Sequence, residues 1–252
     1  MSASPLRLYE LVLGNGISAS PFVWRVRFAL AHKGLAAEAV SLGFTEIPTV
    51  LDGRFKTVPI LEMDDEAVVD SWAIADRLDE AFPERPRLFA GPGERAMVQF
   101  FDDWFMYAAL RPLFSLYALD IHDAAKPCDQ AYFRQSREDR VGRTLEEFVA
   151  GREKRVPKVR DGFEPIRRAL ARTPFLGGET PNYADYIALG ALLWVSCVAT
   201  MPLFEPDDPM LAWFKRGTDL YGGLGQDPRL RPLDTTAFSS AISAFIGSGA
   251  AV

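Results

Sequence analysis

The sequence predicts a small mixed α/β domain followed by a larger domain made only of helices. Within residues 1–82, two runs of strand-forming residues flank one amphipathic helix, and two further runs are close enough to form a hairpin. Residues 83–95 are rich in proline and glycine, which is typical of a linker. The apolar residues of 96–252 mostly follow helical spacing. The predicted fold class is therefore an α/β N-terminal domain, a linker and an all-α C-terminal domain.

The composition is that of an ordinary globular protein with an excess of acidic side chains. Of the 252 residues, 48% are hydrophobic and 25% are charged, and the net charge is −6 at pH 7. This charge argues against nucleic acid or an anionic membrane as a partner. No apolar run reaches the length of a membrane span, and the first residues lack the apolar core of a signal peptide. We therefore expect a cytoplasmic protein without nucleic-acid or membrane partners.

The cysteines and histidines form no pattern that predicts a metal or redox site. Cys128 and Cys197 lie far apart and make no C-x-x-C pair, so inert thiols in a reducing compartment are expected. His32 and His122 have no metal-ligand spacing around them. The sequence therefore predicts no metal site.

A polar loop joins the first predicted strand, over 6–13, to the first predicted helix, over 21–33. Ser20 is a suitable N-cap because its oxygen can accept a hydrogen bond from an unpaired N–H of the first turn, and Pro21 suits the next position. A hydroxyl and the positive end of a helix then lie just past the end of a strand, which is a place to hold an anion. An ordinary helix start has the same residues, so the pattern alone leaves both interpretations open.

The rest of the first domain is expected to add three strands and a second helix. A strand is predicted over 37–42, with a helical turn near 47–51 after it. A hairpin is predicted over 59–69, and the next helix begins at Asp70–Ser71. This order of β-α-β, hairpin and helix describes a thioredoxin-like arrangement.

The second domain is expected to consist of helices joined by short turns. A long helix over 95–117 should be kinked or broken at Pro112, which lacks a backbone donor. Residues 123–160 are strongly charged and are predicted to form a solvated face. Asn182, followed by Asp185, predicts a variant of the capping box. The remaining predictions are helices over 163–172, 182–198 and 209–221, and a tail rich in small residues from 234.

The loop before the first helix also fits the dinucleotide-binding pattern G-x-G-x-x-G/A. Gly14, Gly16 and Ala19 fill its positions, and Glu38 lies at the distance of the acidic ribose ligand. Three features argue against this alternative. The helix is expected to start only at Pro21, Glu38 falls near the start of its strand, and no further βαβ units follow.

Four motifs in order resemble the glutathione transferase superfamily over nearly the whole chain. They are residues 20–30 (SPFVWRVRFAL), Val58–Pro59, Asp70–Ser71 and residues 182–185 (NYAD). The resemblance implies a thioredoxin-like domain that binds glutathione as co-substrate, a helical domain with the second-substrate site, and a homodimer.

Three features are similar to one branch of that superfamily, the bacterial β-etherases and related fungal transferases. They are residues 21–25 (PFVWR), residues 69–72 (VDSW) with residues 78–80 (LDE), and the long charged segment 123–160. The β-etherases use glutathione to cleave β-aryl ethers of lignin fragments. The similarity therefore implies an aryl ether as one possible substrate.

Ser20 stands where other subfamilies carry tyrosine or cysteine, so the resemblance implies the serine type. Its hydroxyl would stabilise the thiolate of glutathione, and Ser18 is the competing donor, although it lacks the cap position. Lowering a thiol pKa by about 2 units needs about 2.7 kcal/mol. A hydrogen bond to a charged group contributes about 1.5–3 kcal/mol and a helix N-terminus about 0.3–2 kcal/mol. The two together reach the required free energy.

The resemblance also assigns the groups that bind glutathione. The backbone of Val58, next to Pro59, would pair with the tripeptide, and Lys56 would meet its glycyl carboxylate. Asp70 would bind the γ-glutamyl ammonium, and Ser71, with the N–H groups of its helix, the γ-glutamyl carboxylate. A cis peptide bond before Pro59 is compatible with this position.

The second substrate is expected between the two domains, against aromatic side chains. The candidates are Phe22, Trp104, Tyr107, Phe114 and Tyr117, and core packing is the alternative role for each. The implied partner is a small hydrophobic or aromatic electrophile. The alternative function is a non-catalytic module of the same fold that carries glutathione or another ligand, or that binds a protein.

Overall fold

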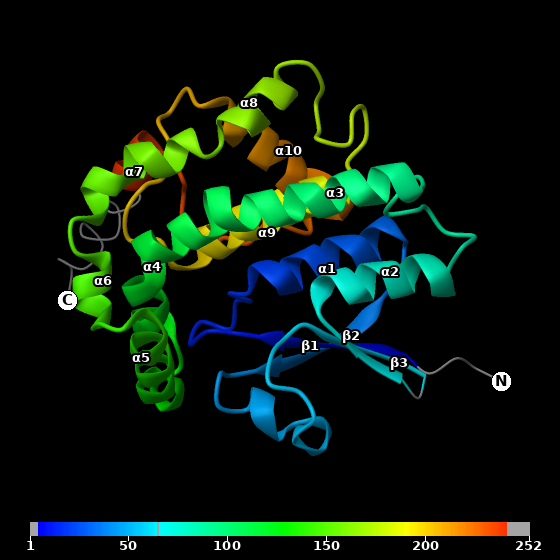
Figure 1. Cartoon of the computed structure of the whole chain (residues 1–252), viewed down its shortest axis with the longest axis horizontal. Helices are drawn as coiled ribbons and strands as arrows, with labels where there is room; N and C mark the ends of the chain where they lie inside the picture. The colour runs from blue at the N-terminus through cyan, green and yellow to red at the C-terminus, as the bar shows by residue number, and fades with distance from the viewer. Residues whose placement is uncertain (1–4, 65, 241–252) are drawn as a thin grey trace.

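The computed structural model describes residues 5–64 and 66–240 and shows the two-part architecture (Figure 1). A four-stranded sheet and two helices, α1 (Pro21–His32) and α2 (Ser71–Ala81), form the N-terminal domain. Part of the helical C-terminal domain lies beyond α1 and α2, on the side away from the sheet, and its green helices at the left of the view lie beside the N-terminal domain (Figure 1). The predicted fold class, a mixed sheet domain followed by a helical domain, is confirmed.

The sheet contains one parallel and two antiparallel pairings, in the order β2-β1-β3-β4. Its strands are β1 (Leu6–Leu11), β2 (Ala37–Leu42), β3 (Ile60–Met63) and β4 (Glu66–Val69). The first strand ends two residues earlier than predicted, and Val12, whose N–H still donates to the oxygen of Leu42 at 2.8 Å, forms a bridge with Ser18 of the next loop. Among the described residues a hairpin follows the single βαβ unit, so the dinucleotide-binding interpretation of residues 14–19 is wrong.

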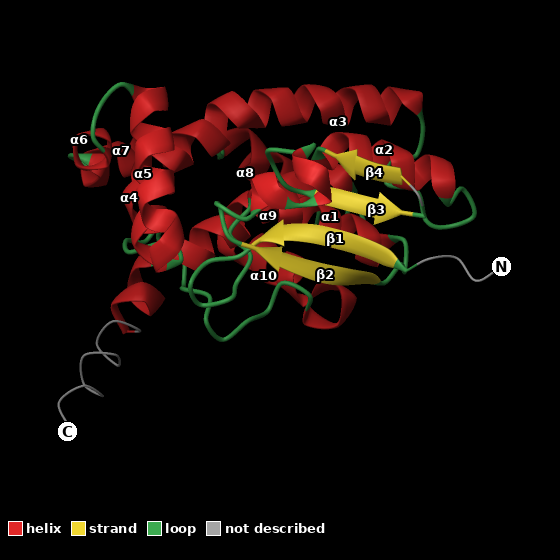
Figure 2. Cartoon of the chain, turned by 90° about the horizontal axis from the view of Figure 1, so that it is seen from below, coloured by secondary structure: helices red, strands yellow, loops and turns green. Residues whose placement is uncertain are grey.

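Helices α1 (Pro21–His32) and α2 (Ser71–Ala81) cover one face of the sheet, and Figure 2 shows the strands from the opposite side. Arg27 of α1 donates hydrogen bonds to the carboxylate of Glu10 in β1, and its Nε lies 2.9 Å from Glu10 Oε2. The side chain of Glu10 therefore faces the helices. Two short 3₁₀ turns, Ile47–Thr49 and Leu51–Gly53, lie between β2 and β3, near the predicted helical turn.

The helical domain begins inside the stretch that was predicted to be a linker. Its helices are α3 (Pro92–Phe105), α4 (Arg111–Ala124), α5 (Pro127–Val141), α6 (Leu145–Val149), α7 (Arg152–Asp161), α8 (Glu164–Leu170), α9 (Tyr183–Val198) and α10 (Pro209–Gly223). The predicted helix over 95–117 is split by a π-helical turn at Met106–Leu110. Pro112, in the first turn of α4, cannot donate to the carbonyl four residues earlier, and the wider π turn accommodates its ring.

Helix α9 is the centre of the molecule, and all of its residues are buried. It packs against α1, α3, α4 and α10. Gly190 allows the closest approach to α1, because a Cβ atom there would lie 2.4 Å from the backbone oxygen of Pro21. The predicted capping box is present, with Asn182 bonded to the backbone of Ala184 at 2.9 Å and Asp185 to the backbone of Asn182 at 3.1 Å.

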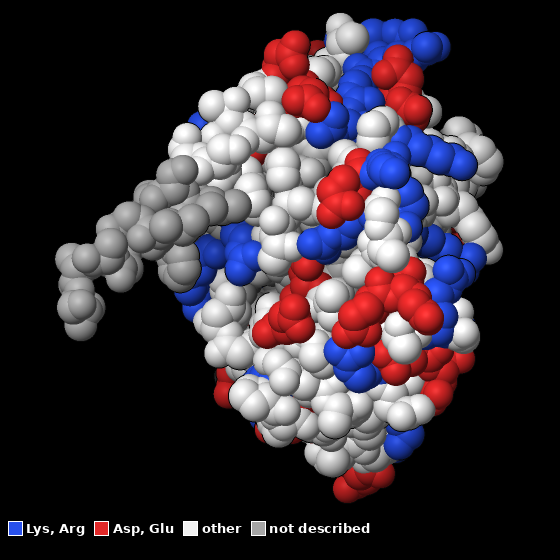
Figure 3. All heavy atoms as spheres, turned by 90° about the vertical axis from the view of Figure 1, so that its left-hand side faces the viewer, with Lys and Arg blue, Asp and Glu red and all other residues white. Residues whose placement is uncertain are grey.

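The charged segment 123–160 forms α5, α6 and α7 at one side of the molecule. Figure 3 shows basic and acidic side chains interspersed on that side. Arg134 illustrates the pairing, since it bonds Glu138 and Glu146 at 2.9 Å. Interspersed ion pairs of this kind are what the prediction of a solvated face requires.

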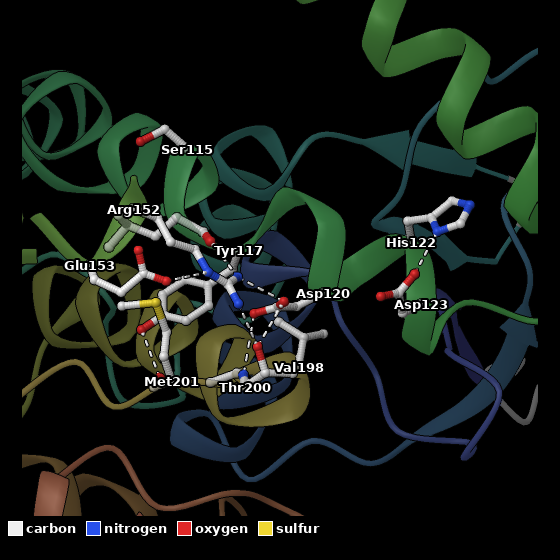
Figure 4. Close-up of polar contacts among 12 residues, drawn as sticks. Ser115, Tyr117, Asp120, His122, Asp123, Arg152, Glu153, Val198, Thr200 and Met201 are labelled. Carbon is white, nitrogen blue, oxygen red and sulfur yellow. Dashed lines mark hydrogen bonds and ion pairs between the residues drawn. The ribbon is translucent and has the colours of Figure 1, made fainter. Parts of the chain in front are cut away.

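The inner side of α7 is attached to the domain core by Arg152. Its guanidinium donates to Asp120 at 2.8 Å, to the backbone oxygen of Leu116 at 2.9 Å and to Thr200 at 2.8 Å (Figure 4). Asp120 also accepts from the hydroxyl of Thr200 at 2.9 Å. These contacts join α7, α4 and the end of α9.

The beginning of the small-residue tail packs on the helical domain. Asp234 forms a β-bridge with Phe204, and the side chain of Phe238 is buried. Residues 241–252 of the predicted tail lie outside the described residues. Of the helices in the described ranges, none combines the length and the apolarity needed to cross a bilayer.

Candidate active site

Ser20 caps α1 as predicted, at the end of the loop that follows β1. Its Oγ accepts a hydrogen bond from the backbone N–H of Val23 at 3.3 Å, and no acidic side chain lies in the first turn. A serine hydroxyl that accepts a hydrogen bond keeps its own O–H for donation. In the described part of the chain this O–H has no acceptor. The positive end of α1 and a free donor therefore coincide at Ser20.

Ser18 and Ser20 are both buried, with exposed fractions of 1% and 6%, and they differ in their hydrogen bonds. Ser18 has no hydrogen-bond partner for its hydroxyl within the described ranges. Its backbone oxygen accepts from Trp24 Nε1 at 3.0 Å and from Cys197 Sγ at 3.1 Å. Burial raises the pKa of the Cys197 thiol to about 12, so this thiol stays protonated.

The helical domain holds the loop before Ser20 from two sides. The backbone N–H of Gly14 donates to the oxygen of Ala124 at 3.0 Å, at the end of α4. Arg229, beyond α10, donates to the backbone oxygen of Asn15 at 2.7 Å. The position of the Ser20 hydroxyl therefore depends on both domains.

Val58 lies on an open backbone edge directly before β3. Its peptide bond to Pro59 is cis, and the ladder of β3 starts only at Ile60. The backbone N–H and C=O of Val58 have no hydrogen-bond partner among residues 5–64 and 66–240. Lys56, two residues earlier, is exposed. This edge offers a donor and an acceptor to an extended peptide.

Asp70 caps α2 and lies next to the edge at Val58. Its backbone N–H donates to the oxygen of Pro59 at 3.3 Å. Oδ1 accepts from the N–H groups of Trp72 at 2.9 Å and Ala73 at 3.1 Å, which leaves Oδ2 for another donor. The φ angle of Asp70 is +85°, in the left-handed region that costs free energy for a residue with a side chain. Strain of this kind clusters at functional sites.

A largely buried ion pair joins α1 to α3. Arg25 Nη1 lies 2.9 and 3.0 Å from the two carboxylate oxygens of Asp102, and the guanidinium stacks on the Phe22 ring at 4.7 Å. Burial raises the pKa of Asp102, and the charge of Arg25 lowers it. This pair was not predicted from the sequence. The available signal was an arginine within the apolar run of the first helix.

Tyr183 belongs to the motif at residues 182–185, but its contact with the N-terminal domain was not predicted. It is fully buried at the start of α9, and its hydroxyl donates to the backbone oxygen of Ser71 at 2.6 Å. Ser71 itself is 2% exposed in the first turn of α2. The sequence offered no signal for this contact, because it joins residues 112 positions apart.

Three of the predicted second-substrate residues have rings that are at least partly accessible to solvent, and they lie on α1, on α3 and on the π turn. Phe22 is partly exposed at the start of α1. Trp104 and Tyr107 line a hollow of about 540 Å³ on α3 and the π turn, together with Phe100, Asp103 and Ala108. The exposed fraction of Tyr107 is 65%.

The other two candidates are farther along, on α4. Phe114 is partly buried against Phe148, with ring centroids 5.8 Å apart. Tyr117 is fully buried, and its hydroxyl donates to the backbone oxygen of Met201 at 3.2 Å (Figure 4). This placement corrects the expectation for Tyr117, whose ring belongs to the core.

Within residues 5–64 and 66–240, no three histidine, cysteine, aspartate or glutamate side chains are grouped so that they could hold a metal ion.

Two family models match the chain and divide it in the same way as the structure. The glutathione S-transferase N-terminal domain matches residues 16–86, and the glutathione S-transferase C-terminal domain matches residues 96–202. The chain belongs to the glutathione S-transferase superfamily. Among curated relatives, the glutathione S-transferase-like protein ustS of Aspergillus flavus is 26% identical in an alignment 222 residues long, and this alignment covers 76% of this chain and 80% of that protein.

Solved glutathione transferase structures share the fold of this chain over almost its full length. Glutathione transferase GSTFuA3 from Phanerochaete chrysosporium has a TM-score of 0.70 at 23% identity, with 97% of each chain covered. A glutathione S-transferase of Ceriporiopsis subvermispora in complex with glutathione has the same TM-score and coverage at 22% identity. These similarities confirm the fold.

Proposed function

We propose that this protein is an active glutathione transferase of the serine type, in which Ser20 stabilises the glutathione thiolate. The observation that carries the proposal is the free O–H of Ser20 at the positive end of α1. An unperturbed thiol has a pKa of about 8.5, so at neutral pH only a small fraction is ionised. The donated hydrogen bond and the helix end favour the thiolate over the thiol.

The reaction follows from the chemistry of the thiolate. Bound glutathione loses its thiol proton to water, and the sulfur then attacks an electrophilic carbon. A carbon–sulfur bond forms while the bond to the leaving group breaks, and the leaving group departs with the electron pair. Ser20 acts on the first step, because its hydrogen bond lowers the free energy of the thiolate.

The tripeptide is proposed to lie along the edge between Val58 and Asp70. The unpaired N–H and C=O of Val58 pair with its backbone, and Lys56 meets the glycyl carboxylate. The free oxygen of Asp70 binds the γ-glutamyl ammonium, and the first turn of α2 at Ser71 binds the γ-glutamyl carboxylate. The bond between Asp70 and Pro59 keeps these two subsites at a fixed spacing.

The second substrate is proposed to be a small aromatic electrophile bound against Phe22, Trp104, Tyr107 and Phe114. Aromatic rings give large apolar contact to an aryl group. If the sequence similarity to the β-etherase branch extends to activity, the electrophilic carbon bears an aryl ether and the leaving group is a phenolate. A screen of β-aryl ether compounds, with release of the phenol as the readout, tests this finer proposal.

Ser20→Ala tests the assignment of the thiolate donor, with Ser18→Ala as the matched control. Conjugation of an aryl halide by Ser20→Ala should fall about 10- to 100-fold in kcat/KM, since the lost hydrogen bond to a charge is about 1.5–3 kcal/mol. Ser18→Ala removes a buried hydroxyl without a partner and should keep wild-type turnover. Equal turnover of Ser20→Ala and wild type would remove Ser20 from the mechanism.

Thermal stabilisation by glutathione separates the proposal from the non-catalytic alternative. An enzyme is stabilised by glutathione and conjugates the aryl halide. Stabilisation without conjugation indicates a carrier of glutathione, and the absence of both indicates a protein-interaction module. Wild-type protein decides among the three, and no variant is needed.

The chain is also proposed to act as a homodimer in the cytoplasm. Two large apolar side chains of α3, Met97 and Phe100, have exposed fractions of 64% and 65%, and contact with a second copy would remove them from water. Met97→Asp, at the exposed residue of this pair that does not line the hollow of Trp104 and Tyr107, should shift the mass measured by light scattering from dimer to monomer. A wild-type protein that is monomeric at micromolar concentration would contradict this proposal.

A further inference from the structure

Tyr183 connects the central helix of the C-terminal domain to the first turn of α2. Its hydroxyl donates to the backbone oxygen of Ser71 at 2.6 Å, in a bond between two buried groups. Ser71 lies in the turn proposed to bind the γ-glutamyl carboxylate, so the inference rests on the proposed function. A carbonyl oxygen has two lone pairs, so this bond adds to the one expected within the helix.

The tyrosine ring is held on several sides and cannot easily turn away. Its centroid lies 5.4 Å from that of Phe89 and 5.8 Å from that of Trp72, both in edge-to-face geometry. Its backbone follows Asn182, the N-cap of the capping box that starts α9. Burial raises the pKa of Tyr183, so its hydroxyl remains a neutral donor. A fixed donor in a water-excluded position defines the place of its acceptor closely.

The turn that Tyr183 contacts is one that needs support. Asp70, immediately before Ser71, has a φ angle of +85°, and a backbone in that region persists only when surrounding contacts hold it. The bond from Asp70 N–H to Pro59 supports the turn from the sheet side. Tyr183 supports it from the helical domain. Without the second support, the backbone of Ser71 can shift relative to the helical domain, and the turn that Asp70 caps shifts with it.

We propose that Tyr183 is a positioning residue for glutathione, which sets the first turn of α2 so that it binds the γ-glutamyl group. It does not touch the thiol or the second substrate in this proposal. Its loss should therefore weaken the binding of the γ-glutamyl end alone. A tyrosine that only filled the core would weaken every ligand to the same degree or none.

Tyr183→Phe removes only the hydroxyl, and Tyr186→Phe is the matched control. Tyr186 lies one turn along the same helix, is equally buried, and its hydroxyl bonds His32 at 2.7 Å, away from α2. The probes are S-hexylglutathione and S-hexylcysteinylglycine, which lacks the γ-glutamyl group. We expect Tyr183→Phe to raise the Kd of the first about fivefold, which corresponds to about 1 kcal/mol, and to leave the Kd of the second unchanged. Tyr186→Phe should change neither.

Steady-state kinetics give the second readout. Tyr183→Phe should raise the KM for glutathione about fivefold, with kcat and the KM for an aryl halide within about twofold of wild type. An equal loss for both hexyl ligands, no loss for either, or a variant that does not fold would overturn the inference. Wild-type protein that binds no S-hexylglutathione would instead refute the proposed function and this inference with it.

Discussion

The two ends of α1 belong to one helix of 12 residues but have opposite hydrogen-bonding states. At the N-terminus, Ser20 makes a single capping bond and keeps an O–H without an acceptor among the described residues. At the C-terminus, the ammonium group of Lys33 is fully buried and all three of its hydrogens are used. It lies 2.8 Å from Asp79, 3.2 Å from the oxygen of Phe82 and 3.1 Å from that of Pro86.

His32 completes the closed network at the C-terminal end. Its Nε2 lies 3.0 Å from the backbone oxygen of Arg87, which can only accept, so Nε2 carries the hydrogen of the neutral ring. Its Nδ1 then accepts from the hydroxyl of Tyr186 at 2.7 Å, and the hydroxyl of Tyr221 donates to that of Tyr186 and lies 3.2 Å from Nδ1. Polar groups that satisfy one another indicate structure, whereas an unused donor at a helix end indicates a place for a ligand.

The largest expected effect is at the C-terminal end of α1, the closed end, where Lys33 and His32 have all their hydrogen bonds satisfied. Lys33→Met leaves Asp79 without its buried cation, and breaking a buried ion pair from one side costs about 3–5 kcal/mol of unfolding free energy. Glutathione affinity of the folded variant should stay at the wild-type value, because the change lies at the far end of the helix. Urea unfolding and calorimetric titration measure the two quantities.

Lys215→Met is the matched control for Lys33→Met. Lys215 pairs with Asp219 at 2.8 Å, but its side chain is 75% exposed, so water already solvates both charges. We expect a loss below about 0.5 kcal/mol. Similar losses for the two lysine variants would contradict the view that the C-terminal end of α1 is a closed structural network.

Ser20→Asp separates the two roles assigned to Ser20, which are to cap the N-terminus of α1 and to donate a hydrogen bond to the thiolate. Aspartate is as good an N-cap as serine and suits the positive helix end, so the free energy of unfolding should be unchanged or slightly higher. Its carboxylate cannot donate and repels a thiolate, so kcat/KM should fall by at least about 100-fold, or about 2.7 kcal/mol. Ser20→Thr, which keeps both the cap and the donor, should retain most of the activity. An active Ser20→Asp enzyme is the result that would refute the thiolate site.

The capping residues were predictable from the sequence, but the contacts between domains were not. Ser20, Asp70 and Asn182 each cap through bonds to backbone groups within three residues, so local residue types predict them. The Arg25–Asp102 pair joins residues 77 positions apart, and the Tyr183–Ser71 bond joins residues 112 positions apart. Nothing in local spacing identifies such partners.

Helical spacing also failed to predict which aromatic side chains of residues 97–117 face outward. The π turn at Met106–Leu110 adds a residue to one turn and rotates every later side chain relative to the earlier ones. Tyr107 is 65% exposed whereas Tyr117 is fully buried. A regular helix cannot predict this change of face, and Pro112 was the only indication of it.

Gly190→Ala acts on the open end through packing. The new methyl group would lie 2.4 Å from the backbone oxygen of Pro21, which cannot move without shifting the first turn of α1. We expect a loss of about 1–3 kcal/mol in unfolding free energy and weaker glutathione binding. Gly93→Ala, in α3, is the control, because a Cβ atom there has no neighbour within 4 Å. Wild-type affinity in Gly190→Ala would show that the position of this turn does not matter for the ligand.

The smallest expected effect is the pH dependence of the closed end. Burial lowers the pKa of His32 and the charge of Lys33 lowers it further, whereas the oxygen of Arg87 and Asp79 raise it. The neutral ring is therefore favoured in the folded state. Its contribution to stability is present above the unfolded pKa of about 6.5 and is lost as the pH falls toward the lower folded value.

His32→Gln should flatten this acid-side loss, because glutamine does not titrate. The difference between wild type and variant is expected to stay below about 1 kcal/mol, since the ring is partly exposed and screened. Urea unfolding at pH 5, 6 and 7 measures it, with glutathione affinity at pH 7 as the control. Because His32 lies at the end of α1 opposite Ser20, that affinity should be unchanged. If the free energy of unfolding of His32→Gln fell with pH as steeply as that of the wild type, the titrating group would lie elsewhere in the fold. If His32→Gln bound glutathione more weakly, the two ends of α1 would be coupled.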